Sequence, residues 1–233
     1  MTDRFLAIAK DPSIIPGVHH YCDEWCDYCP VSRRCLAFRC TAEFRRQHRR
    51  REGESTFASI EQAVAFTREL SALDGSSTRE LDNIMANPSG QSGLHTVDPL
   101  ASVAWEYAVG AVFLMTPAML SEISARRRSS GPTPAEVVLW HHLRIYMKVV
   151  RALIALERMV ATGCASEEPA GCIKLVLVSL DRSRESLRLL RTQANGSEVA
   201  GLIAALDDLE RGLDRRVPEA RGYVRFGIDC PVV

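Results

Sequence analysis

The stretch that decides the fold is Thr133 to Gly163, TPAEVVLWHHLRIYMKVVRALIALERMVATG. Thr133 is followed at once by a proline and three positions later by Glu136, which is the pattern of a helix N-cap with a first-position proline and a capping-box glutamate. Apolar residues then return at alternating spacings of four and three until Gly163. This pattern predicts one long helix with a continuous buried face. The predicted face consists of Val138, His142, Ile145, Val149, Ala152, Leu156 and Met159.

Further helices are expected on both sides of this stretch. Asp98 followed by proline is a helix start that predicts a helix to about Met115. Two more helices are expected from about Cys172 to Asn195 and from Ser197 onward. Their predicted inward residues are Ile173, Val176, Leu180, Leu187 and Leu190 in the first, and Val199, Leu202, Leu206, Leu209 and Leu213 in the second. An earlier helix is expected from about Thr56 to Leu73, and a short one after a capping box at Ser77 to Glu80.

The fold class that follows is all-α, because no run of β-branched and aromatic residues alternates with a period of two. We expect a helical bundle of four or five long helices with an N-terminal Cys-rich metal-binding loop. Residues 1–53 are expected to hold that loop and an arginine-rich helix, and residues 54–233 the bundle, with an extended C-terminal tail from Arg221. The loops Asn87 to Val97 and Ser129 to Thr133 are short enough for one continuous domain.

Composition places the chain among globular proteins. It has 233 residues, 46% of them hydrophobic, and 29 basic residues against 29 acidic ones. A net charge of zero excludes a binder of polyanions over its whole surface, so contact with nucleic acid would need a local patch. We expect no export signal in MTDRFLAIAK, because an acid lies beside its first arginine and its apolar stretch is short. No run approaches the ~18–20 apolar residues that span a bilayer. We therefore expect a cytoplasmic protein with no membrane contact.

Five of the eight cysteines lie between Cys22 and Cys40. The spacing C-x3-C-x2-C-P-x4-C brings Cys22, Cys26, Cys29 and Cys35 into fourteen residues. In a reducing compartment, clustered cysteines are more often metal ligands or catalytic thiols than disulfides. The spacing therefore predicts a metal site on these four thiolates.

Two kinds of metal centre fit this spacing. Structural zinc sites draw their ligands as two separated pairs, whereas bacterial ferredoxin ligands form a compact run with a proline after a cysteine. The run here is compact, so we expect a [4Fe-4S] cluster that serves electron transfer or redox sensing with an unknown redox or protein partner. Trp25 and Tyr28 are expected to shield the cluster from water. Zinc is the alternative.

The first three cysteines resemble the radical-SAM signature, with Tyr28 in the aromatic position. Radical-SAM enzymes place that motif after a strand of a β/α barrel, and this chain has neither the strands nor the glycine-rich segment of that family. A fourth nearby cysteine, Cys35, also removes the need for an open iron.

The segment Cys22 to Cys35 is similar to that of an uncharacterised bacterial family with the signature CDxWCxxCPxxxRC near the N-terminus. Lys174 to Ser186 and Ala220 to Asp229 resemble further segments of the same group. The resemblance implies a helical fold and assigns no activity.

An arginine-rich helix is expected directly after the cysteines, with Leu36, Cys40 and Phe44 on its apolar face. The segment from Arg33 to Arg51 contains eight arginines and only one acidic residue, Glu43. Such a segment can approach a phosphate backbone. The candidate contact residues are Arg45, Arg46, Arg49, Arg50 and Arg51. A zinc-stabilised interaction or regulatory module that touches nucleic acid or an acidic partner is therefore the alternative function. A solvated helix face is the expectation we prefer, because the overall charge is zero.

A second site inside the bundle is a further hypothesis. Dinuclear carboxylate sites use Glu-x-x-His pairs, and the chain has none. Five residues could still meet inside the bundle: Glu106, His141, His142, Asp181 and Glu185. Capped or salt-bridged groups are the expectation we prefer. Glu106 in an apolar helix and His142 on the predicted buried face are the residues to consider first. Neither G-x-S-x-G nor a P-loop is present, so the residues leave open whether the protein is an enzyme.

Overall fold

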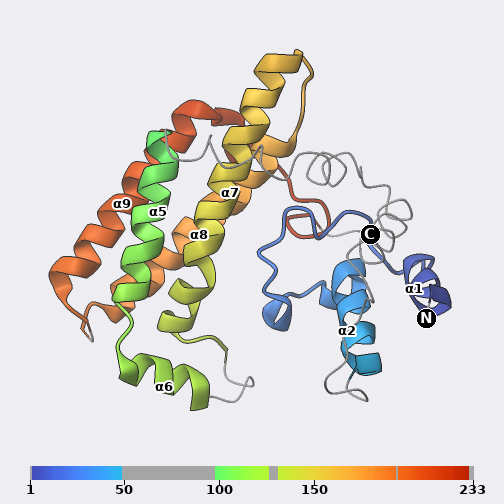
Figure 1. Ribbon diagram of the computed structural model, residues 1–233, viewed down its shortest axis with the longest axis horizontal. Helices are drawn as coiled ribbons and strands as arrows, with labels where there is room; N and C mark the ends of the chain where they lie inside the picture. Colours follow the sequence, from blue (N-terminus) through green and yellow to red (C-terminus); the bar gives the residue numbers. More distant parts are fainter. Residues whose placement is uncertain (1, 49–97, 126–130, 193, 231–233) are drawn as a thin grey trace. The chain divides into compact units, whose positions relative to one another are not determined.

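The computed structural model of the chain describes residues 2–48, 98–125, 131–192 and 194–230 (Figure 1). These residues are mostly helical and contain no strand, only an isolated bridge between Phe226 and Cys230. The all-α prediction is thus confirmed for the described part of the chain. Its α-helices are α1 (Thr2–Ala9), α2 (Leu36–His48), α5 (Pro99–Phe113), α6 (Pro117–Ala125), α7 (Pro134–Thr162), α8 (Glu168–Leu190) and α9 (Gly196–Arg216). The helices predicted from Thr56 and from Ser77, and the loop from Asn87, lie outside the described residues.

The chain divides by its internal contacts into two compact units. Unit 1 comprises Met1–Gln91 together with Arg225–Val233, and unit 2 comprises Ser92–Val224. The predicted boundary after residue 53 falls outside the described residues. The C-terminal tail, which we had assigned to the bundle, contributes its last residues to unit 1.

Helix α7 of unit 2 begins and ends where the sequence indicates. The Thr133 hydroxyl accepts a hydrogen bond from the Glu136 N–H at 3.0 Å, and the Glu136 carboxylate accepts one from the Thr133 N–H at 3.4 Å. Gly163 adopts a left-handed φ of 67° and ends the helix. On the buried face, however, His141 stands where His142 was expected.

The reason for this difference lies in the helix period. Val138 and Ile145 are both fully buried, and with 3.6 residues per turn the next buried position after Val138 falls between 141 and 142. The sequence pattern fits either histidine, so the packing of neighbouring helices decides. His141 is fully buried, whereas His142 is half-buried with its Nδ1 beside the Leu139 carbonyl.

Helices α5 and α9 run antiparallel at close range. A Cβ at Gly110 of α5 would press on the Leu202 side chain of α9, and a Cβ at Gly212 of α9 would overlap the Leu100 side chain of α5. Each glycine therefore gives room to a leucine of the other helix. Asp98, whose carboxylate caps α5 by accepting from the Leu100 N–H at 2.8 Å, also pairs with Arg216 of α9 at 3.0 Å.

Helix α8 packs against α7 and α9, and the predicted inward residues of α8 and α9 are all buried. Helix α8 begins at Glu168, four residues before the predicted start, because Pro169 supplies a favourable first turn. It ends at Leu190 instead of Asn195, whose side chain caps α9 by accepting from the Ser197 N–H at 3.2 Å.

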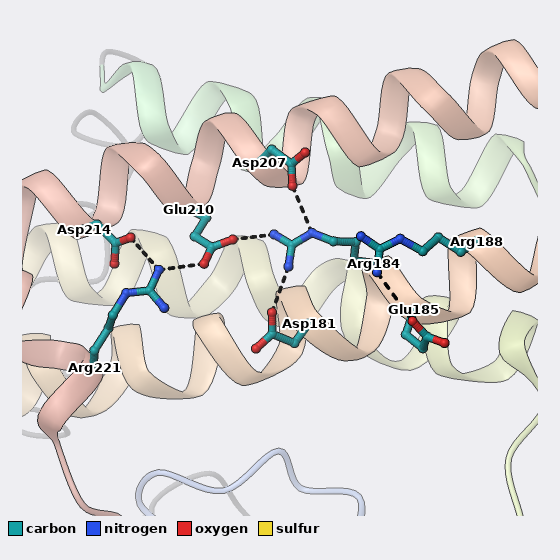
Figure 2. A network of polar contacts seen from close by, with 8 residues as sticks. All are labelled: Asp181, Arg184, Glu185, Arg188, Asp207, Glu210, Asp214 and Arg221. Atoms are coloured by element: carbon teal, nitrogen blue, oxygen red, sulfur yellow. Dashed lines mark hydrogen bonds and ion pairs between the residues drawn. The ribbon is translucent and has the colours of Figure 1, made fainter.

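Charged side chains join α8 and α9 to the 3-10 helix η4 (Pro218–Gly222), as Figure 2 shows. Arg184 of α8 contacts Asp207 at 2.9 Å and also pairs with Glu210, both on α9. Arg221 of η4 reaches Glu210 at 2.6 Å and Asp214 at 2.5 Å. Partial burial alone would raise the pKa of Glu210, but hydrogen bonds from Arg221 and Arg184 hold it below its usual value. Glu210 is thus shared by two arginines from different elements.

No single helix in the described ranges is both long and apolar enough to cross a membrane. Helix α5 and the first part of α6 meet the length and composition criteria only as a pair, and they are bent by 83° at the break between them.

Unit 1 is built from short elements. Phe5 of α1 packs with Leu36 and Cys40 of α2 in one small core, and Phe44 lies at its edge. The predicted apolar face of the helix after Cys35 is therefore confirmed. A second core contains Ile15, Val18 and Cys35, with Val31, Phe38 and Ile228 packed around it.

Candidate metal centre

The four clustered cysteines lie along two short 3-10 turns, η1 (Cys26–Tyr28) and η2 (Ser32–Arg34). Cys29 follows the first turn and Cys35 the second, and each donates its N–H to the carbonyl of the first residue of the turn, at 3.3 and 3.1 Å. Two such turns in succession fold the chain back on itself. They bring Cys26, Cys29 and Cys35 into the lining of one pocket.

All four cysteines line one pocket of unit 1. The space between protein atoms there is about 280 Å³, part of it open to solvent, with an inner cavity of about 20 Å³. A cavity of that size is just large enough for one water molecule. The other lining residues are Val18, His19, Asp23, Glu24, Trp25, Val31, Ser32 and Ile228.

The thiols in this pocket influence one another electrostatically. Burial raises the pKa of the Cys22 thiol to about 11, and the negative charge of a Cys35 thiolate adds to the shift, although a hydrogen bond with the Glu24 backbone opposes it. Burial also raises the pKa of Cys26, with further contributions from Cys35 and Cys29. The sulfurs therefore lie close enough for their thiolate charges to repel. A cation placed among them would relieve that repulsion and displace the protons.

The pocket lining is not arranged around a single point. Within the described ranges, no group of three or more His, Cys, Asp and Glu side chains has the geometry to hold one metal ion. The Cys22 thiol instead donates a hydrogen bond to the His19 carbonyl at 3.3 Å. To act as a ligand together with the other three, Cys22 must give up this hydrogen bond and turn toward them.

Trp25 forms part of the pocket wall and is only 6% exposed. Its backbone N–H is held by the Asp23 carboxylate at 3.1 Å. Tyr28 packs edge-on against Trp25, with ring centroids 5.0 Å apart. Trp25 therefore contacts the pocket itself and Tyr28 supports Trp25 from behind.

The remaining cysteines lie outside this pocket. Cys40 is buried in α2 and Cys172 in α8, whereas Cys164 and Cys230 are exposed.

The arginine-rich segment is described only in part. Arg45 and Arg46 are exposed on α2, and Arg49, Arg50 and Arg51 lie outside the described residues. Arg46 pairs with Glu43 of the same helix at 2.7 Å.

Two arginines closer to the cysteines are also engaged within unit 1. Arg39 binds Asp11 at 2.7 Å, and the Arg34 side chain donates to the Ser13 carbonyl at 3.1 Å. Of the arginines near the cysteines, Arg39 and Arg46 are thus in ion pairs within unit 1.

The candidate residues for a second site are not brought together. Glu106 is exposed on α5, and His142 is half-buried on α7. Asp181 and Glu185 are exposed on α8, where they pair with Arg184 and Arg188. His141 is the histidine that the structure buries.

Ile228 is a pocket residue that the sequence did not indicate. It lies 193 to 206 positions from the four cysteines in sequence (228 − 35 and 228 − 22), and no local pattern connects an isoleucine of the tail with a cysteine loop. Only the packing of the chain reveals the contact.

The chain matches no protein-family model, no curated protein and no solved structure.

Proposed function

We propose that Cys22, Cys26, Cys29 and Cys35 bind one metal centre, and that this centre is a [4Fe-4S] cluster used in electron transfer or redox sensing. The observation that carries the proposal is that all four cysteines line a single pocket. The two 3-10 turns give a physical reason for this, because they return the chain to the same pocket between successive cysteines.

A [4Fe-4S] cluster suits the arrangement of the four cysteines, which line a pocket instead of converging on one point. Each cysteine of a [4Fe-4S] site binds a different iron, so the sulfurs have to surround a cavity instead of converging on one point. The compact run with Pro30 after Cys29 is similar to the ligand run of bacterial ferredoxins, which also has a proline after a cysteine, although its spacings differ. Trp25 in the wall would limit the access of water, which affects both potential and stability toward oxygen.

Zinc is the second candidate, and the inner cavity of about 20 Å³ favours it. A cavity of this size accepts a single ion after small side-chain rotations, whereas a cluster requires the loop to open further. In this alternative the zinc holds together an interaction or regulatory module whose arginines, Arg45 to Arg51, touch nucleic acid or an acidic protein. The internal ion pairs of Arg39 and Arg46 weigh against that contact.

The proposal also includes the finer prediction of the fold, a bundle of long helices with an N-terminal metal-binding loop. Helices α5, α7, α8 and α9 each pack against two of the others, which supports a bundle of long helices within unit 2. The metal-binding loop belongs to unit 1 and is proposed from the cysteine pocket alone. A reducing, cytoplasmic setting would keep the thiols available for metal. Membership in the family with the CDxWCxxCPxxxRC signature stays a prediction.

The test is to purify the protein without oxygen and to measure its colour and metal content. A cluster gives broad absorbance near ~400 nm and about four irons per chain. A colourless protein with about one zinc per chain supports the second candidate and contradicts the first. A protein that holds neither metal, even after reconstitution with iron and sulfide or with zinc, contradicts both.

Cys35→Ser supplies the matched variant, with Cys164→Ser as its control. Cys35 is buried beside the pocket and Cys164 is exposed in unit 2. We expect the first substitution to abolish or strongly reduce bound metal and the second to leave it unchanged. Equal metal content in both variants would remove Cys35 from the ligand set.

The nucleic-acid alternative has its own test. Binding of duplex DNA or single-stranded RNA should weaken as salt rises, and Arg45→Ala with Arg46→Ala should weaken it further. Binding that does not depend on salt, or no binding, would end this alternative.

A further inference from the structure

The end of the chain forms a compact turn from Arg225 to Asp229. The Asp229 carboxylate accepts a hydrogen bond from the Arg225 N–H at 2.9 Å and binds the Arg225 guanidinium at 2.6 Å. The Arg225 carbonyl accepts from the N–H groups of Ile228 and Asp229 at 3.0 and 2.9 Å. The Arg225 residue is only 8% exposed. The turn is therefore closed by both backbone and charged side-chain contacts.

This turn is fitted to the core of unit 1 at Gly227. Gly227 has a φ of 77°, a conformation that other residues adopt only with strain. A Cβ at this position would lie 2.9 Å from a methyl carbon of Ile15 and 3.2 Å from one of Val18. The backbone of the turn thus rests directly on two residues that are themselves 2% and 4% exposed.

The neighbouring side chain reaches the cysteines. Ile228 packs against the cluster of Ile15, Val18 and Cys35, and it also lines the cysteine pocket. Cys35 is the most deeply buried of the four pocket thiols. The same turn therefore supplies an apolar wall to the pocket from the far end of the sequence.

We propose that the turn Arg225–Asp229 is a cap on the cysteine pocket, which holds Ile228 against the Cys35 side of the pocket and limits the access of solvent and reagents to its sulfurs. Closure depends on Gly227, which permits the close approach to Ile15 and Val18, and on the Arg225–Asp229 pair, which keeps the turn folded. The role of the cap at a metal centre rests on the proposed function. The shielding of the thiols by the cap does not depend on the proposed function.

The experiment measures how fast a thiol reagent modifies each cysteine in the reduced, metal-free full-length protein. Iodoacetamide is added without oxygen, and the labelled cysteines are located by mass spectrometry at several times. Three cysteines outside the pocket serve as internal references. Cys164 reports intrinsic reactivity, Cys40 reports opening of the other core of unit 1, and Cys172 reports opening of unit 2.

Gly227→Ala is the decisive variant and Gly222→Ala its control. Nothing lies within 4 Å of a Cβ at Gly222, which does not have a positive φ. We expect Gly227→Ala to speed the labelling of Cys35 about 5- to 30-fold, because the strain and the overlap favour the open turn. The rates of Cys40 and Cys172 should stay unchanged. Gly222→Ala should behave as the native protein.

Two outcomes would overturn the cap. One is an unchanged Cys35 rate in Gly227→Ala. The other is an increase in the labelling rate of Cys40 as large as that of Cys35, which would mean that the turn stabilises all of unit 1. Asp229→Asn is the second variant, and it should raise the Cys35 rate in the same selective way because it weakens the pair that closes the turn.

The same variants separate this inference from the proposed function. If the native protein binds no metal, the proposed function fails, yet selective labelling still supports the cap. If it binds metal and the Cys35 rate does not respond to Gly227→Ala, the cap fails and the metal proposal stands. If both hold, Gly227→Ala should also lose iron from the cluster to a chelator faster than Gly222→Ala does.

Discussion

The two units of the chain are stabilised in different ways. Unit 2 contains helices of 15 to 29 residues, α5, α7, α8 and α9, that bury a long series of apolar side chains. The described part of unit 1 has helices of 8 and 13 residues around two small cores. Small cores rarely supply enough burial for independent stability, and metal sites often compensate for this. The cysteine cluster lies in the unit where such support is most useful.

The largest loss of stability is expected when a substitution creates a cavity in the core of unit 2. Leu180 of α8 is fully buried, and Leu180→Ala should lower the free energy of unfolding by about 2–5 kcal/mol. Leu189→Ala on the same helix is the control, because Leu189 is 57% exposed and should cost well under ~1 kcal/mol. Urea unfolding followed by circular dichroism measures both. Equal losses would mean that α8 is not a core helix.

Metal binding should stabilise unit 1 selectively. Zinc added to the metal-free protein at about 100 times its dissociation constant contributes about 2.7 kcal/mol to whichever unit binds it. Amide hydrogen exchange should therefore slow near Cys29 and Cys35 and remain unchanged around Leu180. Slower exchange in α8 alone would contradict the assignment of the site to unit 1.

The ion-pair network of Figure 2 offers a smaller test within unit 2. The Arg184 side chain is 12% exposed and holds Asp207 and Glu210 together, so Arg184→Met should cost about 1–3 kcal/mol by leaving two carboxylates without their shared partner. Arg188 and Glu185, at 60% and 67% exposure, form a surface pair, and Arg188→Met should cost less than ~1 kcal/mol. Urea unfolding of both variants gives the comparison, and a larger loss for Arg188→Met would contradict it.

The smallest change in stability is expected when low pH protonates Asp11 of unit 1. Hydrogen bonds from the Ser13 side chain and backbone, and then from Arg39, lower the pKa of Asp11 from 3.8 to about 2. A carboxyl whose pKa is lower in the folded state stabilises the fold above about pH 4, and this contribution disappears as the pH falls toward 2. An NMR titration of the Asp11 carboxyl carbon should find it still ionised at pH 3. A midpoint near 4 would show that the contacts with Ser13 and Arg39 do not persist.

Local signals identified the helix ends well because the groups that cap a helix lie within a few residues of its end. The Thr133–Glu136 capping box, Asp98 before Pro99, and Gly163 all act where the sequence places them. The start of α8 was missed although Pro169, which lies in the first turn of the helix, is a local signal for it. The N-terminal helix α1 was not expected at all, since its apolar face is short.

The candidate site, like the helix ends, was predictable only where it depends on residues close together in the sequence. The spacing of the four cysteines is a local property, and the pocket that they share agrees with it. Of the second-site residues, Glu106 was selected because it lies in an apolar helix, and His142 because of its helical phase. Phase errors of one residue turn a side chain by about 100°, and the structure buries His141 instead.

The sequence by itself determined the caps of α5 and α7, the buried faces of α8 and α9, and the clustering of four thiols within fourteen residues, since these depend on contacts between near neighbours or on helical spacing. Only the tertiary structure decided which histidine is buried, how Gly110 and Gly212 bring α5 and α9 together, and that Gly227 and Ile228 close the cysteine pocket. Those features depend on residues far apart in the chain. The packing of whole helices and turns brings these distant residues together, and no local sequence pattern encodes that packing.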